Sequence, residues 1–335
     1  MHARHAWFLI GPTAAGKTAV AHRLALRGGT AVLSADAMLV YRGMDVGTAK
    51  PTAAERREVR YFGIDLADPD RPFSAGAWLE RVRADLADGP WGRAPADPLA
   101  PDALLVAGGT GLYVRALTAG LDAAPADPAR RRHWQARLAA EGLPALAAEL
   151  ARRAPDFRLA DAQNPRRVIR ALEQLDAGKA PAAAGLSARP AAVGLRLARP
   201  ALHARILARV RRMFDDGLLD EVAALRQRYP AWGHSHASKR AGVAASPEDD
   251  GGCTARQAIG YAEACAVLDG HLTVEMAAER IAARTRQLAK RQETWFRHQT
   301  DAAWIDVGPD EPADAVAERV LAAWREHGPT PIRVA

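Results

Sequence analysis

Short unbroken apolar runs alternate along the chain with longer segments of helical periodicity. The apolar runs occupy residues 7–10, 30–33, 103–107, 191–197 and 303–307. Runs of this kind, without polar alternation, are typical of strands that are buried on both faces of a parallel sheet. Strands that alternate with helices predict an α/β fold. We therefore expect an open parallel sheet covered by helices.

Helical periodicity fills most of the remaining chain, at residues 111–180, 201–227, 255–268, 273–299 and 311–326. The first of these segments carries no strand signal over its whole length. We therefore expect an α/β core made of residues 1–115 and 190–335, interrupted by a mostly helical insertion at 116–189. Two loops are expected as well: a Pro-rich one at 89–102 and a Gly/Ser/Asp-rich one at 230–254, to which the residues assign no chemistry.

A phosphate-binding motif follows the first expected strand. Residues Gly11-Pro12-Thr13-Ala14-Ala15-Gly16-Lys17-Thr18 match G-x-x-x-x-G-K-[ST] and lead into a helix, which is the setting of a P-loop. The backbone N–H groups of such a loop and the helix N-terminus attract an anion. Lys17 would neutralise the outer phosphate, and the Thr18 hydroxyl would bind Mg²⁺. The motif predicts a polyphosphate ligand but does not specify which one.

Two further strands end in small or polar residues. Asp36 follows the strand at 30–33, and Thr110 follows the strand at 103–107. Because ligands of open α/β sheets bind at the carboxyl ends of strands, we expect Gly11, Asp36 and Thr110 to converge. Either polar residue could instead cap a turn or a helix. The third strand lacks the terminal Asp with which P-loop kinases and ATPases hold Mg²⁺, which argues against phosphoryl transfer.

Composition places the chain among globular proteins. Of its 335 residues, 49% are hydrophobic and 25% are charged, which is typical of a globular protein with a substantial core. No apolar run approaches the about 18 residues of a membrane span, and the two cysteines are too few for a disulfide framework. We therefore expect a cytoplasmic protein without a membrane segment.

The basic residues are gathered in two clusters. The formal net charge of +7 favours an anionic partner. Arg166, Arg167 and Arg170 lie about one helical turn apart, and segment 280–298 carries six Lys or Arg residues against the single acid Glu293. A solvated helix face normally mixes charges of both signs. The two clusters therefore favour a polyphosphate or RNA backbone over plain solvent exposure.

Taken together, these motifs resemble the bacterial tRNA dimethylallyltransferases, also called tRNA isopentenyltransferases. The matching segments are 11–18, 34–51, 108–113, 164–173, 203–209, 258–261 and 284–297. Two stretches within them, Gly47-Thr48-Ala49-Lys50-Pro51 and Ala289-Lys290-Arg291-Gln292, are far more specific to this family than a P-loop alone.

The resemblance implies the transfer of a dimethylallyl group from dimethylallyl diphosphate to tRNA. The acceptor would be N6 of the adenosine 3′ of the anticodon, in tRNAs that read codons beginning with U. Diphosphate would be released with the help of Mg²⁺, the cofactor we expect, and the P-loop would bind the donor diphosphate rather than ATP. The helical insertion would clasp the anticodon stem-loop, and we expect a monomer.

The resemblance also implies roles for individual residues. Asp36 would be the general base, and Thr110 would hydrogen-bond the diphosphate near the breaking bond. The diphosphate-binding residues would be Gly11, Pro12, Thr13, Ala14, Ala15, Gly16, Lys17, Thr18, Arg205 and Arg209. The tRNA-binding residues would be Asp36, Ala37, Met38, Leu39, Thr110, Arg131, Arg166, Arg167, Val168, Ile169, Arg170, Arg256, Gly260, Tyr261, Arg284, Gln287, Lys290 and Arg291.

The chain departs from the family pattern just after Asp36. Ala37 stands where many relatives have serine, and Leu39 stands where glutamine is frequent, so a hydroxyl contact to the target base is missing. Two alternative functions are compatible with the motifs. A P-loop kinase for a small metabolite or nucleotide predicts phosphoryl transfer from ATP, and a non-catalytic RNA-binding protein predicts a function that survives the loss of Asp36.

Overall fold

The computed structural model describes residues 4–93, 97–121, 127–157, 159, 162–181, 189–230 and 254–334. They form two compact units. The first contains the described residues up to Gly120, those of 189–230 and those from Thr254 onward, and the second contains the described residues of 121–181. The Gly/Ser/Asp-rich loop expected at 230–254 lies, apart from its two end residues, outside the described residues.

A mostly parallel sheet forms the centre of the first unit. Its strands are β1 (Arg4–Ile10), β2 (Ala31–Ser34), β3 (Arg60–Phe62), β4 (Leu104–Gly108), β5 (Ala191–Arg196), β6 (Asp301–Asp306) and β7 (Thr330–Ile332). The order is β3-β2-β4-β1-β5-β6 with every neighbouring pair parallel, and β7 pairs antiparallel with the start of β1. The five apolar runs of the sequence are all strands, so the expected α/β fold is confirmed.

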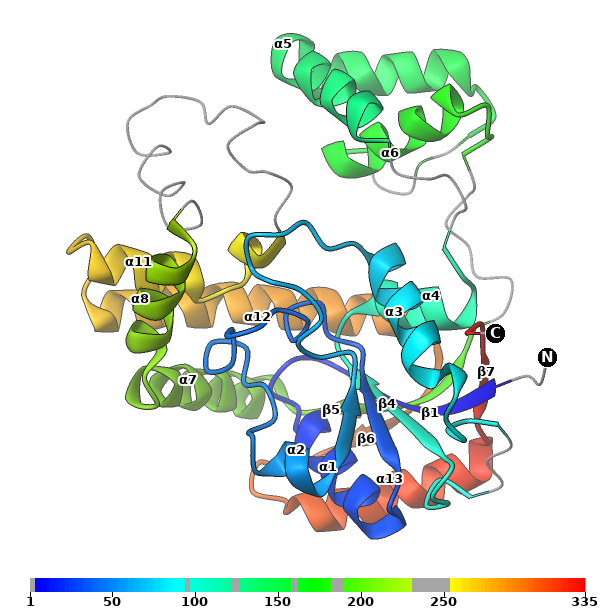
Figure 1. The fold of residues 1–335 in the computed structure, drawn as a ribbon, viewed down its shortest axis with the longest axis vertical. Coiled ribbons are helices and arrows are strands. Elements are labelled where there is room, and N and C mark those ends of the chain that lie inside the picture. The colour runs from blue at the N-terminus through cyan, green and yellow to red at the C-terminus, as the bar shows by residue number, and fades with distance from the viewer. Residues whose placement is uncertain are drawn as a thin grey trace. The chain divides into compact units, whose positions relative to one another are not determined.

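Helices cover both faces of this sheet (Figure 1). They are α1 (Lys17–Gly28), α2 (Glu55–Glu58), α3 (Ala75–Ala87), α4 (Gly111–Thr118), α7 (Arg199–Asp215), α8 (Leu218–Arg228), the 3₁₀ helix η1 (Thr254–Gln257), α11 (Tyr261–Leu268), α12 (Val274–Gln299) and α13 (Ala313–His327). Helices α1 and α13 pack together on one face, and α3 and α4 pack together on the other. None of the described helices is long and apolar enough to cross a membrane.

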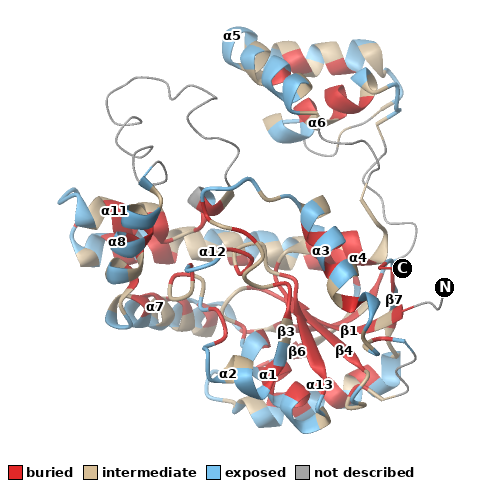
Figure 2. Cartoon of the chain, in the orientation of Figure 1, coloured by how far each residue is buried: buried red, intermediate tan, exposed pale blue. Residues whose placement is uncertain are grey.

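The core lies between these layers. Strands β1, β2, β4 and β5 are buried along most of their length, as Figure 2 shows in red, because they lie between helices on both faces of the sheet. Trp324 of α13 is buried against β1, where its indole Nε1 donates a hydrogen bond to the carbonyl of Phe8 at 3.1 Å. This contact anchors the last helix beneath the strand that leads into the P-loop.

Three segments that were predicted to be continuous helices are interrupted in the structure. The segment 201–227 is two helices, because Gly217 takes φ 93° between α7 and α8 and ends the first of them. The segment 255–268 begins as η1 and becomes α-helical only at Tyr261. The segment 111–180 is interrupted after α4, so it is helical only in parts.

The second unit consists of α5 (Pro128–Arg153) and α6 (Pro165–Asp176). The side chains of Asp127 and Asn164 accept hydrogen bonds from the first backbone N–H groups of these helices, and each helix has proline at its first position. Helix α5 breaks at Gly142, shortly before Pro144. The two helices share a small core made of Trp134, Leu146, Leu150, Val168, Ile169, Ala171 and Leu172.

Candidate active site

The P-loop between β1 and α1 has the backbone of an anion cradle. Ala14 and Gly16 take positive φ angles of 65° and 92°, and α1 begins directly afterwards at Lys17. A positive φ at alanine is strained, and such strain persists where surrounding structure enforces it, commonly at functional sites. The Lys17 ammonium donates to the carbonyl of Pro12 at 2.7 Å, which folds its side chain over the loop. The cradle therefore combines helix N–H groups with a buried cation.

A cavity of about 390 Å³ opens in front of this loop. The strand ends of β2 and β4 and the helix α7 form its other walls. Its polar lining residues include Thr13, Lys17, Thr18, Ser34, Asp36, Thr48, Arg205, Arg209, Arg212 and Gln292. Four cations face one carboxylate, so the cavity suits a multiply charged anion such as a diphosphate.

Burial controls the protonation of the two cations nearest the loop. It lowers the pKa of Lys17 to about 8, against the opposing attraction of Asp36 and with a smaller contribution from the positive charge of Arg209. It also lowers the pKa of Arg209, where Asp36 again opposes the shift and Arg212 adds to it. An anion in the cavity would supply the charge that these desolvated cations lack.

Lys17 predicts a pH dependence of anion binding. Only its ammonium form attracts diphosphate, so the affinity should be full below its pKa of about 8 and should be lost as the pH rises through that value, by up to about tenfold per pH unit. The dissociation constant of inorganic diphosphate, measured by calorimetry between about pH 7 and pH 9, tests this. Lys17→Met serves as the control, since it reports the titration of the ligand alone. Parallel pH profiles of the two proteins would contradict the prediction.

Asp36 and Thr110 meet beside the P-loop. The Thr110 hydroxyl accepts a hydrogen bond from the N–H of Ala37 at 3.0 Å, and Asp36 Oδ1 accepts one from the N–H of Met38 at 2.9 Å. Thr110 stands at the N-cap position of α4, but its side chain makes no capping hydrogen bond there. The alternative that it serves to cap this helix is therefore wrong. The second oxygen of Asp36 accepts no hydrogen bond from any described residue.

A second cavity, of about 430 Å³, adjoins the first. Thr13, Asp36, Thr48, Arg209 and Gln292 line both cavities. The second one has a wall of aliphatic side chains, contributed by Ile206, Val210, Met213, Ile259, Ile281 and Leu288. Its opposite rim is polar, with Arg284, Gln287 and Arg291 of α12. The site thus has a cationic chamber and a partly apolar one that share the carboxylate of Asp36.

Gln292 of α12 connects the parts of this site. Its Oε1 accepts a hydrogen bond from the N–H of Thr13 at 2.8 Å, and its Nε2 donates to the carbonyl of Gly109 at 3.0 Å. It therefore holds the P-loop against the turn that carries Thr110. No role for Gln292 is predicted from the sequence, although the Ala-Lys-Arg-Gln stretch that contains it is one of the two most specific segments of the family resemblance. Arg212 and Thr48, which line the first cavity, were missed as well.

The two arginines expected at the diphosphate both reach this region from α7. Arg209 donates to the Thr13 hydroxyl at 3.3 Å and to the carbonyl of Thr48 at 3.0 Å. Arg205 lines the first cavity, and its guanidinium donates to the carbonyls of Gly308 and Pro309 at 3.1 and 2.7 Å. Both side chains are thus fixed by hydrogen bonds to backbone or side-chain oxygens.

Four of the expected tRNA-binding residues lie on α12. On α12, Gln287, Lys290 and Arg291 are exposed. Arg284 of the same helix forms an ion pair of 2.5 Å with Glu263. The side chain of Arg256 lies outside the described residues.

The other expected tRNA-binding residues are spread over both units. Asp36, Ala37, Met38 and Thr110 line the second cavity, whereas Leu39 lines the first. Gly260 and Tyr261 lie at the start of α11, and the rest lie in the second unit. Arg131 and Arg170 pair with Glu173 at 2.7 and 3.4 Å, whereas Arg166 and Arg167 are exposed on α6. Four expectations need correction, because the side chains of Leu39, Val168, Ile169 and Tyr261 are buried and so do not offer a surface to RNA. Val168 and Ile169 instead form the core that holds α6 in place.

The cavity also suits a hard divalent cation bound together with phosphate. The Thr18 and Ser34 hydroxyls and the Asp36 carboxylate all line it, and Mg²⁺ prefers oxygen ligands of this kind. Ser34 Oγ is buried and makes no hydrogen bond within the described part of the chain. A buried hydroxyl oxygen without a hydrogen-bond partner is suited to contact the ion directly or through a water molecule.

Comparisons with known proteins agree on one family. The family model described as IPP transferase matches residues 39–299. A tRNA dimethylallyltransferase of Anaeromyxobacter sp. (strain K) is 42% identical over 323 residues, which is 93% of this chain and 95% of that protein. The crystal structure of the full-length tRNA isopentenylpyrophosphate transferase of Bacillus halodurans is 32% identical with a TM-score of 0.60, covering 97% of this chain and 98% of that one. A eukaryotic dimethylallyltransferase acting on tRNA has the same fold, with a TM-score of 0.64 at 20% identity over 90% of this chain and 73% of that one.

Proposed function

Because the chain belongs to the IPP transferase family and its activity is the transfer of a dimethylallyl group to tRNA, we propose the donor, the acceptor atom and the residues that act on them. The donor is dimethylallyl diphosphate. The acceptor is N6 of the adenosine 3′ of the anticodon, in tRNAs that read codons beginning with U. The products are N6-(dimethylallyl)adenosine and diphosphate. Membership of the IPP transferase family favours this reaction over the two alternatives, a metabolite kinase and a non-catalytic RNA-binding protein.

One observation carries this proposal: a cationic cavity and a partly aliphatic cavity meet at a single carboxylate. The diphosphate of the donor fits the first cavity, and its five-carbon chain fits the aliphatic side of the second. Both needs are those of an allylic diphosphate, which joins a multiply charged anion to a short hydrocarbon chain. Asp36 lies where the two parts of the donor join.

Cleavage of the C–O bond develops negative charge on the leaving diphosphate and positive charge on the allylic carbon. Lys17 and Arg209 line the first cavity beside the P-loop, so these cations and the loop N–H groups lie where they can stabilise the leaving group. Thr110 stands beside Asp36, where its hydroxyl can donate to the diphosphate while it accepts from Ala37. Low polarity around these groups strengthens each interaction.

The attacking amine needs a base. The N6 lone pair of adenine is delocalised into the ring, and the amine must lose a proton as the new bond forms. Asp36 lies in both cavities and has one oxygen held by Met38, which leaves the carboxylate oriented to accept that proton. The aliphatic wall of the second cavity offers no polar group to hold a water molecule that would compete for the allylic carbon.

Mg²⁺, when bound with the donor, would be held by Thr18 with help from Ser34 and Asp36, and it would neutralise charge on the diphosphate. The protein would supply the oxygen atoms of these three side chains, which line the cavity in front of the P-loop. We further propose that the protein works as a monomer. We place the reaction in the cytoplasm, where tRNA is modified.

The target adenosine must leave the anticodon loop to reach Asp36. Enzymes that act on a stacked base flip it into a pocket, and RNA loops are read through unstacked bases and backbone phosphates. The exposed Gln287, Lys290 and Arg291 border the apolar cavity or lie beside it on α12, and Arg166 and Arg167 present a second cationic surface on α6. We propose that both surfaces bind the anticodon stem-loop.

Charge reversal at these surfaces is expected to weaken RNA binding. Arg167→Glu and Lys290→Glu should each raise the dissociation constant of the stem-loop and reduce the slope of log K against log salt by about 1. Arg23→Glu is the matched control, since Arg23 is an exposed arginine on α1 paired with Asp314. Fluorescence anisotropy over a salt series measures both quantities. An unchanged slope in Arg167→Glu or Lys290→Glu would show that the residue does not contact phosphate.

The proposed acceptor atom is tested by removing the N6 amine from the target nucleoside of the RNA. A stem-loop with adenosine 3′ of the anticodon should accept the dimethylallyl group, and the same stem-loop with inosine at that position should not, because inosine lacks the N6 amine. Equal labelling of both RNAs would overturn the proposed acceptor.

A further inference from the structure

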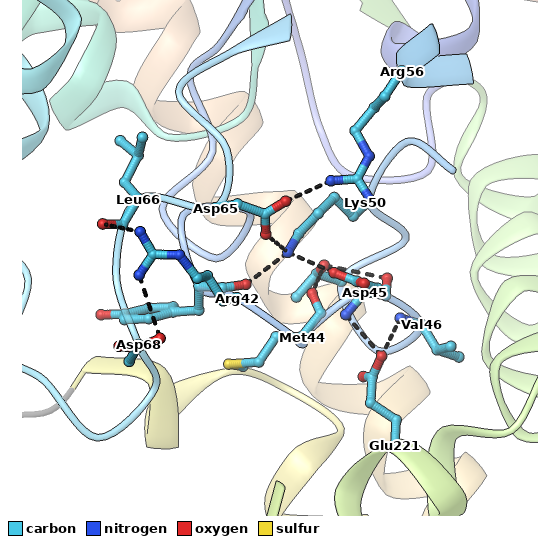
Figure 3. Close-up of polar contacts among 12 residues, drawn as sticks. Arg42, Met44, Asp45, Val46, Lys50, Arg56, Asp65, Leu66, Asp68 and Glu221 are labelled. Carbon is cyan, nitrogen blue, oxygen red and sulfur yellow. Dashed lines mark hydrogen bonds and ion pairs between the residues drawn. The ribbon is translucent and has the colours of Figure 1, made fainter. Parts of the chain in front are cut away.

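The Gly47-Thr48-Ala49-Lys50-Pro51 stretch lies in a loop that two charged side chains hold from opposite sides (Figure 3). On one side stands Lys50, whose side chain is wholly buried. Its ammonium contacts the carboxylates of Asp45 and Asp65 at 2.6 and 2.7 Å and donates to the carbonyl of Tyr41 at 2.6 Å. The ammonium therefore makes two hydrogen bonds and lies beside two carboxylates, which allows a lysine to remain charged when buried.

On the other side stands Glu221 of α8. Its Oε2 accepts from the N–H groups of Asp45 and Val46 at 2.8 and 2.7 Å (Figure 3). Its Oε1 accepts from the N–H of Gly47 at 3.2 Å. Three successive N–H groups that converge on one anion form a backbone nest, here filled by a side chain of the same protein. The Tyr261 hydroxyl donates a fourth hydrogen bond to Oε1 at 2.7 Å.

The nest is closely packed as well as charged. A Cβ atom added at Gly47 would lie 2.6 to 2.7 Å from the ring and hydroxyl of Tyr261, so only glycine fits there. Burial, and next the charge of Glu221, raise the pKa of Tyr261 well above its usual value, so its hydroxyl stays protonated and continues to donate. Glu221 and Tyr261 therefore fix the backbone of residues 45–47 in one conformation.

The consequence reaches the diphosphate cavity through the next residue. The carbonyl of Thr48 accepts a hydrogen bond from Arg209 at 3.0 Å, while the other nitrogen of that guanidinium donates to Thr13 of the P-loop at 3.3 Å. The Thr48 hydroxyl donates back to the carbonyl of Met44 at 2.6 Å, which fixes its own backbone within the same loop. A shift of the loop would thus move the acceptor that orients Arg209.

We propose that Glu221 is a positioning residue of the diphosphate site, acting through the 45–48 backbone and the carbonyl of Thr48 on Arg209. It touches neither cavity itself, so its effect is on the direction of the Arg209 guanidinium rather than on the ligand. This inference rests on the proposed role of the first cavity as a diphosphate site. It gives the Gly-Thr-Ala-Lys-Pro stretch a function, since that stretch supplies the carbonyl, the tight contact and the buried cation.

The test compares Glu221→Gln with Asp269→Asn. The glutamine side chain must turn an NH₂ group toward N–H donors, so it disrupts the nest with almost no change in volume. Asp269 pairs with Arg226 at 2.8 Å and so also joins α8 to the end of α11, but it has no contact with the loop. Isothermal titration with inorganic diphosphate and Mg²⁺, without RNA, should give a dissociation constant about tenfold higher for Glu221→Gln and an unchanged one for Asp269→Asn. Equal affinity of Glu221→Gln and the wild type would overturn the proposal.

Two further measurements separate positioning from loss of structure. A purely structural effect would reduce the number of binding sites and leave the affinity of the remaining ones unchanged. In an Arg209→Gln background, Glu221→Gln should add no further loss of affinity, because both changes act on one guanidinium; additive losses would overturn the proposal. If Glu221→Gln does not fold, Tyr261→Phe, which removes one of the four donors, should weaken diphosphate binding in the same direction.

The outcome is distinguishable from a failure of the proposed function. The proposed function fails if the wild type transfers no dimethylallyl group to the stem-loop. The role of Glu221 is measured by the affinity for inorganic diphosphate, which does not depend on that transfer.

Discussion

Asp36→Asn is expected to lower the single-turnover rate of dimethylallyl transfer by about 10²- to 10⁴-fold, the range of a lost general base. Asparagine keeps an oxygen for the N–H of Met38, so the local fold should be preserved. It cannot take the proton that the adenosine amine must release. Rapid-quench measurement with saturating donor and stem-loop gives the rate directly.

The control for this variant is Asp68→Asn. Asp68 follows β3 and contacts Arg42 and Tyr229 at 3.3 and 3.2 Å, outside both cavities. Its substitution should leave the rate unchanged. Binding of RNA by Asp36→Asn should stay near the wild-type value, since the effect is on the chemical step. A near-normal transfer rate in Asp36→Asn would show that another group removes the proton.

Lys17→Met is expected to lower kcat/KM for the donor by about 10²- to 10³-fold, as for other preorganised groups that stabilise developing charge. Methionine has a similar length but no charge, so the volume of the side chain is nearly retained. The ammonium of Lys17 is buried at the cradle, where its interaction with diphosphate is weakly screened. Steady-state kinetics with varied donor and saturating RNA measure the loss.

Lys179→Met is the comparison for this variant, because Lys179 is an exposed lysine of the second unit. It should leave the donor kinetics unchanged. The KM for RNA should stay constant in Lys17→Met. A donor kcat/KM within twofold of the wild type would contradict the assignment of Lys17 to the diphosphate.

The parallel core could be predicted from the sequence because buried strands leave a strong pattern. The runs that became β1, β2, β4, β5 and β6 are continuous and apolar, and the structure confirms each of them. The strands β3 and β7 were missed, because each has three residues and one of them contains Pro331. These two strands form because they pair with β2 and β1 of the existing sheet. A local sequence pattern does not contain this information.

The carboxyl ends of the strands predicted where the site would form, since parallel strands end at one edge. Gly11, Asp36 and Thr110 lie together for that reason. The contribution of Gln292 could not be derived in this way, because it comes from a helix 279 residues away in sequence from Thr13. The same is true of the contact between Glu221 and the 45–47 backbone, which depends on how α8 packs.

In the basic cluster of α6, the sequence motif did not distinguish exposed residues from buried ones. Arg166 and Arg167 are exposed, whereas the neighbouring Val168 and Ile169 are buried. A contiguous motif had grouped all of them as tRNA-binding. The 3.6-residue helical period separates them, because positions on opposite sides of a helix face the core and the solvent.

The measurement that tests the account most directly is single-turnover incubation of the protein with a labelled anticodon stem-loop, Mg²⁺ and either dimethylallyl diphosphate or ATP, read by mass spectrometry. We expect one dimethylallyl group on the adenosine 3′ of the anticodon with the allylic donor and no change of mass with ATP. A phosphorylated product from ATP, without a prenyl adduct from the allylic donor, would contradict the account.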